Sequence, residues 1–164
     1  MSKTPTAGQL WIALARCYKS LSKLVEDSIA ESGLGLSDFM ILEALLHKGP
    51  MTITEIQGKV LLATGSMTVA VDRLENKGHI ERKTTPEDRR ARVLELTPEG
   101  RTLIAKVFES HNRELESWMS VLTGDERQQA FRALRKLGVS AASNHESTTR
   151  TSKETENHDR HSKK

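Results

Sequence analysis

Residues 79–100 read HIERKTTPEDRRARVLELTPEG. Two short runs with strand character, 80–84 and 91–96, flank a polar loop that contains a Thr-Pro turn signal. Residues 82–92 include five basic and two acidic side chains. The pattern predicts a two-stranded ribbon with a guanidinium-rich tip. Such a ribbon suits insertion into a DNA groove, because arginine forks onto phosphates and base edges.

The ribbon follows a pair of short predicted helices. Residues 52–55 read Thr-Ile-Thr-Glu, a capping box, so we expect a helix over 53–60. After a turn at 61–65, another helix is expected over 66–77, with Gly78 as its stop. Three apolar residues mark its inner face at helical spacing: Met67, Val71 and Leu74. A helix pair followed by a basic ribbon indicates a winged helix-turn-helix.

Helices are also expected on both sides of this lobe. One runs over residues 8–30 with an unusually broad apolar face, and Ser37 is expected to cap the next. Thr97-Pro98-Glu99 starts a helix after the ribbon, and a capping box at 123–126 starts the last one. The expected fold is mostly α with a small two-stranded β-wing.

The length of 164 residues fits one domain, with a winged helix-turn-helix lobe at 36–97 and a helical region at 8–35 and 98–143. Residues 144–164 contain no Ala, Val, Ile, Leu, Met, Phe, Trp, Tyr or Cys. We expect this tail to be disordered, because it cannot bury enough apolar surface to offset its ordering entropy. Its three histidines are irregularly spaced, which favours a solvated tail over a metal site.

Composition narrows the class of protein. The net charge of +3 permits nucleic-acid binding without requiring it. The N-terminus is polar, no apolar run approaches the roughly 20 residues of a membrane span, and the single Cys17 excludes an intramolecular disulfide framework. We therefore expect a cytoplasmic protein without membrane contact. Phosphate loops, nucleophile elbows and Cys or His metal pairs are absent from the sequence, so no enzyme activity, cofactor or metal is expected.

Three motifs stand in a specific order along the chain. They are Asp-Arg-Leu-Glu-Asn-Lys-Gly at 72–78, Asp88-x-Arg90, and Leu-Thr-x-x-Gly at 96–100. Together they resemble the MarR family of bacterial and archaeal transcriptional regulators, over about residues 10–138. The resemblance implies an obligate homodimer in which the first and the last two helices of each chain interleave, and the broad apolar face of the first helix agrees with this.

The resemblance also implies a recognition helix that enters the major groove. Ser66, Thr68 and Val69 match the positions that meet base edges, and Arg73 matches a basic position that meets phosphate. The family often has Arg or another polar residue where this chain has Val69 and Ala70. Base readout there is expected to be apolar, for instance against thymine methyl groups.

In the wing, the resemblance implies contact with a flanking minor groove. Asp88 matches the acid that orients a tip arginine, and Arg90 matches that arginine. Arg89 and Arg92 are its neighbours. With the recognition helix, these residues form the expected DNA-binding site for a pseudo-palindromic operator.

Two mechanisms could release the expected repressor from DNA. Family members often release DNA when a small aromatic or phenolic ligand binds, and five residues are candidates to line such a pocket: Trp11, Tyr18, Phe39, His47 and His111. Others sense oxidants through a cysteine, here Cys17. Because Cys17 shares the apolar register of Leu14 and Leu21, we expect it to be packed, which favours the ligand. A third alternative is a winged-helix module for protein association, without DNA binding.

Overall fold

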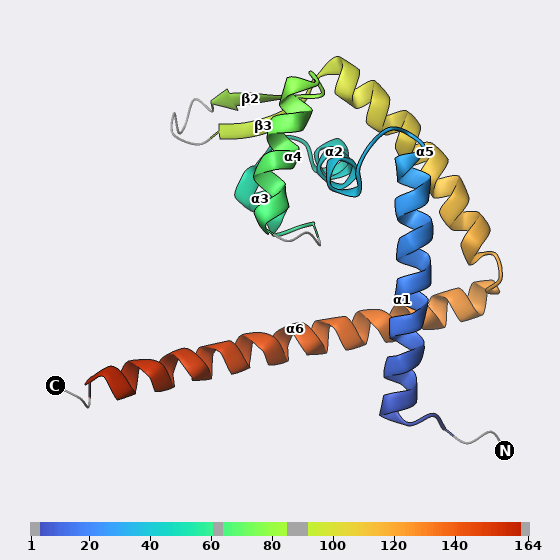
Figure 1. The fold of residues 1–164 in the computed structure, drawn as a ribbon. Helices are drawn as coiled ribbons and strands as arrows, with labels where there is room; N and C mark the ends of the chain where they lie inside the picture. Colours follow the sequence, from blue (N-terminus) through green and yellow to red (C-terminus); the bar gives the residue numbers. More distant parts are fainter. Residues whose placement is uncertain (1–3, 61–63, 85–91, 162–164) are drawn as a thin grey trace. The chain divides into compact units, whose positions relative to one another are not determined.

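The computed structural model describes residues 4–60, 64–84 and 92–161 and divides into two compact units, Met1–Leu115 and Glu116–Lys164. The predicted fold class, mostly helical with a small β-wing, is confirmed. Within the described residues the elements are α1 (Ala7–Ala30), α2 (Leu36–Lys48), β1 (Met51–Thr52), α3 (Ile53–Gln57), α4 (Thr64–Asn76), β2 (Ile80–Thr84), β3 (Arg92–Leu96), α5 (Pro98–Met119) and α6 (Gly124–His161) (Figure 1).

The strands form one antiparallel sheet in the order β1-β3-β2. The predicted ribbon is β2 and β3, in which Ile80 pairs with Leu96. The expectation of two strands is incomplete, because Met51 of β1 pairs with Leu94 on the other side of β3. A strand of two residues has no alternation that a sequence pattern can reveal. Thr52, its second residue, also caps α3.

The core of the first unit lies between α2, α4 and the sheet. Ile41 and Leu42 of α2 are fully buried. The three residues predicted for the inner face of α4, Met67, Val71 and Leu74, are fully buried as well. The predicted register of α4 is therefore confirmed, and its opposite face is left outside the core.

Local capping decides where most helices begin. Thr52 Oγ1 accepts from the Glu55 amide at 3.2 Å, and a Glu55 carboxylate oxygen accepts from the Thr52 amide at 2.8 Å, as the predicted capping box requires. Thr123 and Glu126 make the same reciprocal pair at the start of α6. The prediction for Ser37 is wrong: α2 begins at Leu36 after Gly35, and no side chain caps it.

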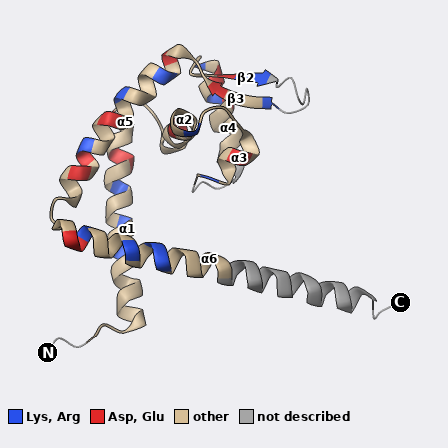
Figure 2. Ribbon diagram, turned by 180° about the vertical axis from the view of Figure 1, so that it is seen from behind, with Lys and Arg blue, Asp and Glu red and all other residues tan. Residues whose placement is uncertain are grey.

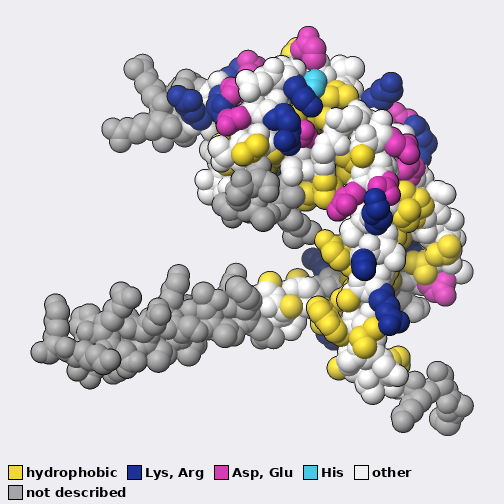
Figure 3. All heavy atoms as spheres, in the orientation of Figure 1, with side chains coloured by type: hydrophobic (Ala, Val, Ile, Leu, Met, Phe, Trp, Pro, Cys, Tyr) yellow, Lys and Arg dark blue, Asp and Glu magenta, His cyan; other side chains and the backbone are white. Residues whose placement is uncertain are grey.

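Helix α1 extends beyond the core of its own unit. Among its residues only Ile29 is buried, and the Trp11 side chain is 68% exposed. Leu10, Ile12 and Tyr18 are exposed too, and Figure 3 shows yellow apolar side chains along this helix. The broad apolar face expected from the sequence exists, but in a single chain most of it contacts water.

Helix α6 is longer than expected. Residues 144–161, which we expected to be disordered, have a helical backbone. The expectation rested on the lack of apolar side chains, which argues against packing in a core. It does not argue against a helix that continues from a capped start, since the segment contains no Gly or Pro to end it.

The junction between the wing and α5 explains the Leu-Thr-x-x-Gly motif. Thr97 Oγ1 donates to the Gly78 carbonyl at 2.7 Å and accepts from the Gly100 amide at 3.0 Å, so one hydroxyl joins the end of α4 to the start of α5. The backbone of His79 lies directly against Gly100. A Cβ added to Gly100 would lie 1.9 Å from the His79 carbonyl oxygen.

We expect Gly100→Ala to lower the free energy of unfolding by about 2 to 3 kcal/mol, because backbone must move to admit the methyl group. Urea denaturation at fixed protein concentration measures the change. Gly138→Ala is the control: nothing lies within 4 Å of its added Cβ, so this helical substitution should be neutral or slightly stabilising. Equal stability of Gly100→Ala and the wild type would contradict the proposed close approach.

Candidate nucleic-acid interface

The outer face of α4 is the first part of the candidate interface. Thr68 is exposed and the Val69 side chain is 61% exposed, whereas Ala70 is buried and faces the core. A large apolar side chain is thus exposed on an otherwise polar helix face. The face opposite Met67, Val71 and Leu74 is exposed at Thr68, Val69, Asp72, Arg73 and Asn76.

A partly buried ion pair joins this helix to α2. Arg73 Nε donates to both Asp38 carboxylate oxygens at 3.1 and 3.0 Å, and Nη2 donates to one of them at 2.5 Å. The Asp38 side chain is only 2% exposed, whereas that of Arg73 is 43% exposed. The hydrogen bonds from Arg73 to Asp38 raise the pKa of the guanidinium above its ordinary value. The two-point contact fixes the rotation of α4 against α2.

Sequence reasoning missed Asp38. The available signal was an acid set among apolar residues of a predicted core helix, since Phe39, Ile41 and Leu42 follow it closely. Such an acid is rarely buried unless it is paired. The sequence does not say which of its 25 basic residues is the partner.

A second arginine joins α4 to the wing. Arg82 of β2 donates through Nη2 to Asp72 at 2.5 Å and through Nη1 to Glu75. Both acids lie on α4, and the Arg82 side chain is largely shielded from solvent. Together with Asp38 and Arg73, this contact holds α4 from two sides, one facing the core helix and one facing the ribbon.

The wing carries a mixture of paired and outward-facing charges. Lys83 of β2 donates to Glu95 of β3 at 2.8 Å and lies 2.9 Å from Glu81. Arg92 is exposed at the start of β3, opposite Thr84. Figure 2 shows basic residues in blue where β2 and β3 reach the loop between them. The predicted tip residues Asp88, Arg89 and Arg90 lie outside the described residues, as does the side chain of Ser66.

The residues expected to bind an effector do not line one pocket. His111 of α5 is buried and packs edge-on against the Phe39 ring of α2, with centroids 5.2 Å apart. His47 packs edge-on against Phe108, with centroids 4.5 Å apart, and lines a different cavity beside Lys59. These two aromatic contacts therefore do not make one common pocket.

The remaining effector candidates lie on the exposed part of α1. Trp11 and Tyr18 are exposed, and so is Cys17. The expectation that Cys17 is packed is wrong for the single chain, because this part of α1 reaches past the core formed by α2 and α4. In the described part of the chain, no three His, Cys, Asp or Glu side chains gather as a metal site would require. None of the described helices is long and apolar enough to cross a membrane.

Comparison with known proteins agrees with this geometry. The MarR family model matches residues 34–91, the part that holds α2, β1, α3, α4 and β2. The HTH-type transcriptional regulator MhqR of Bacillus subtilis (strain 168) is 36% identical over 137 residues, which are 84% of this chain and 94% of that protein.

Two solved structures share the fold. The transcriptional regulator BldR from Sulfolobus solfataricus superposes with a TM-score of 0.70 at 25% identity, over 84% of this chain and 97% of that one. A mutant MarR from E. coli, complexed with operator DNA, superposes with a TM-score of 0.67 at 22% identity, over 81% and 99%. By its winged-helix fold and its similarity to MhqR along most of both sequences, the chain belongs to the MarR family of transcriptional regulators.

Proposed function

We propose that this regulator binds a pseudo-palindromic operator as a homodimer, with α4 in the major groove and the wing in the flanking minor groove, and that it acts as a repressor. One observation carries the proposal: α4 is held by Asp38 and Arg82 from two sides while its outer face stays open. A helix fixed in this way meets DNA with little ordering of its own, so less binding free energy is lost.

The proposed contacts follow from that face. Ser66, Thr68 and Val69 read base edges, and Val69 offers an apolar contact for a thymine methyl group. Arg73 has a second role besides its bond to Asp38. Its side chain is 43% exposed, so the guanidinium can also meet a backbone phosphate beside the groove.

In the wing, Arg92 is exposed beside the tip, where Asp88 would orient Arg90 and Arg89 would follow. A minor groove carries the strongest negative potential where it is narrow, so arginines there respond to groove width more than to base identity. The wing would then contribute affinity, and α4 would contribute most of the sequence preference.

The dimer is proposed from the apolar surface that one chain leaves open. On α6, Phe131 is 61% exposed, and Leu134 and Leu137 follow at helical spacing and are exposed too. On α1, Trp11 and Leu10 are exposed. An exposed apolar stripe of this kind, on each of the two helices by itself, marks an association site. A second copy covers both helices, and its two-fold symmetry would set two recognition helices about 34 Å apart, one turn of DNA.

Release from DNA is proposed to follow binding of a small aromatic or phenolic ligand, with His111 and Phe39 as the contacts nearest the DNA lobe. A thiol switch through Cys17 is the second candidate, since Cys17 is exposed in the single chain and lies on the helix that the second copy would cover. Operator binding by wild type and Cys17→Ser in the presence of peroxide separates the two. If oxidation releases only the wild type, the thiol is the sensor.

Asp38→Asn should lower the free energy of unfolding by about 1 to 2 kcal/mol, because Arg73 loses a charged partner while the site stays buried. It should also weaken operator binding about tenfold, since α4 is no longer fixed. Thermal denaturation and fluorescence anisotropy measure the two effects. Asp27→Asn is the matched control: it breaks the exposed pair with Lys23 and should leave the free energy of unfolding nearly unchanged. Equal effects of the two variants would contradict the proposed role of Asp38.

Arg92→Ala should weaken binding to all duplexes by a similar factor and reduce the slope of log affinity against log salt by about one, as the loss of one phosphate contact requires. Arg90→Ala should behave alike. Thr68→Ala should instead change sequence preference more than total affinity. Anisotropy at two salt concentrations and selection from a random duplex library measure these changes. Arg113→Ala on α5, which pairs with Glu109, is the control. An unchanged sequence preference in Thr68→Ala would remove α4 as the reading helix. Absence of DNA binding by the wild type would favour a protein-association module.

Light scattering of the wild type at micromolar concentration should report about twice 18.3 kDa. Leu134→Glu should yield monomers, because it places a charge in the apolar stripe of α6. Gln129→Glu adds the same charge to another face of α6 and should leave the dimer intact. A folded wild-type monomer at this concentration would refute the proposed assembly.

A further inference from the structure

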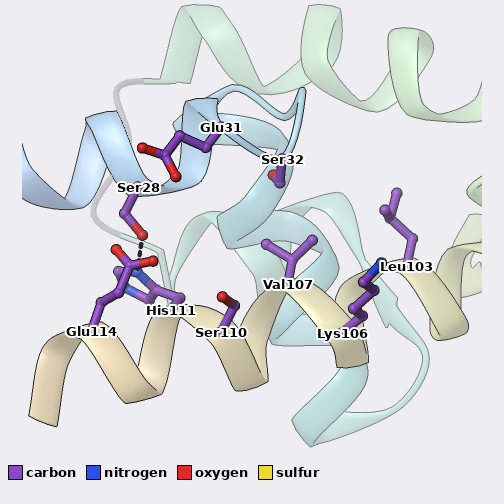
Figure 4. A pocket seen from close by; sticks show the side chains of 9 residues that line it. All are labelled: Ser28, Glu31, Ser32, Leu103, Lys106, Val107, Ser110, His111 and Glu114. Atoms are coloured by element: carbon purple, nitrogen blue, oxygen red, sulfur yellow. Dashed lines mark hydrogen bonds between the residues drawn. The ribbon is translucent and has the colours of Figure 1, made fainter.

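A cavity of about 420 Å³ lies between the last turn of α1 and one face of α5 (Figure 4). Its size falls within the range of small-molecule sites in proteins. Leu103 and Val107 supply apolar surface, and Ser28 and Ser110 supply hydroxyl groups. It therefore combines an apolar body with a few polar groups, as a site for a small amphipathic molecule does.

One end of this cavity is negatively charged. The side chains of Glu31 and Glu114 reach the end where Ser28 meets His111 (Figure 4). Neither carboxylate forms an ion pair with another described residue. Lys106 also lines the cavity, but it lies eight residues from Glu114, or about 12 Å along the helix. The lining therefore carries two carboxylates against one ammonium, and Lys106 lies away from the end where Glu31 and Glu114 meet (Figure 4).

His111 adds no positive charge to that end. Its Nδ1 lies 3.2 Å from Ser28 Oγ, and burial lowers the pKa of the imidazole below its ordinary value, against the opposing effect of Glu114 and Glu43. This lowering of the pKa favours the neutral form of the ring at pH 7. Two carboxylates beside a neutral imidazole attract a cation and repel a carboxylate.

We propose that this cavity is the effector site and that it binds a small aromatic amine. The ammonium lies between Glu31 and Glu114, and the aromatic body rests on Leu103 and Val107. The inference rests on the proposed function as a ligand-released regulator. It narrows the ligand from aromatic molecules in general to aromatic cations, and it disfavours aromatic acids.

The position of the site connects it to the recognition helix. His111 forms the inner end of the cavity and packs against Phe39 of α2. The residue before Phe39 on α2 is Asp38, which accepts hydrogen bonds from Arg73 of α4. A ligand that moves the imidazole therefore acts on α2 at the point where α2 fixes α4. It releases DNA when it binds better to the chain with α4 displaced.

Three probes of matched shape and different charge test the ligand class: tyramine, 3-(4-hydroxyphenyl)propanoate and 4-hydroxyphenylethanol. Calorimetry on the full chain without DNA measures binding. Tyramine should bind in the millimolar range or tighter, the neutral alcohol more weakly, and the carboxylate not at all. The double variant Glu31→Gln, Glu114→Gln should bind tyramine about tenfold more weakly.

The matched control is Glu26→Gln, Glu109→Gln. It removes the same charge from the same two helices, at exposed positions that do not line the cavity. Tyramine binding should be unchanged in it. The proposal is overturned if the carboxylate binds as tightly as tyramine, if tyramine does not bind, or if the Glu31, Glu114 variant binds it as the wild type does. Operator binding by the ligand-free wild type tests the proposed function separately, so the two failures are distinguishable.

Discussion

The contact between Asp38 and Arg73 is the constraint on which the DNA-binding lobe depends. A carboxylate that is 2% exposed is costly to bury without a partner, and the guanidinium meets both of its oxygens. The pair therefore admits one relative placement of α2 and α4. Arg82 then ties the other side of α4 to the wing. The surface that would face DNA is set by charges within the protein before any DNA is present.

The parts of the fold that follow from local chemistry could be predicted from the sequence. The capping boxes at Thr52 and Thr123 need only residues three positions apart. The inner face of α4 needs only a helical period. The prediction for Ser37 was wrong because serine is a good capping residue, but the helix begins one residue earlier, after Gly35, without a side-chain cap. The extra strand β1 was not predicted because its partner, β3, lies about forty residues away in the sequence.

In the candidate site, too, local features could be predicted from the sequence and long-range contacts could not. Thr68 and Val69 could be assigned from periodicity, and they are exposed as expected. Asp38 could not be paired with Arg73, because the contact spans 35 positions and no local rule selects that partner. The exposure of Cys17 was mispredicted for a related reason. An apolar register on α1 indicates that something covers the helix, but not that the same chain does so.

Helix α2 links the proposed ligand site to the recognition helix α4. Helix α2 contacts α5 through the edge-on pair of Phe39 and His111, and it contacts α4 through Asp38. A ligand between α1 and α5 and a DNA duplex on α4 would therefore act on one helix from opposite sides. Coupling between two such sites is reciprocal. DNA that favours the held position of α4 therefore lowers the affinity for the ligand by the factor by which the ligand lowers the affinity for DNA.

A double-mutant cycle on operator binding with Asp38→Asn and Arg73→Met tests this account most directly. If Asp38 acts by holding Arg73, its substitution has little further effect once Arg73 is replaced. The cycle should then give a coupling free energy of about 1 to 2 kcal/mol. Additive losses, with a coupling near zero, would contradict the claim that this ion pair sets the recognition helix for DNA.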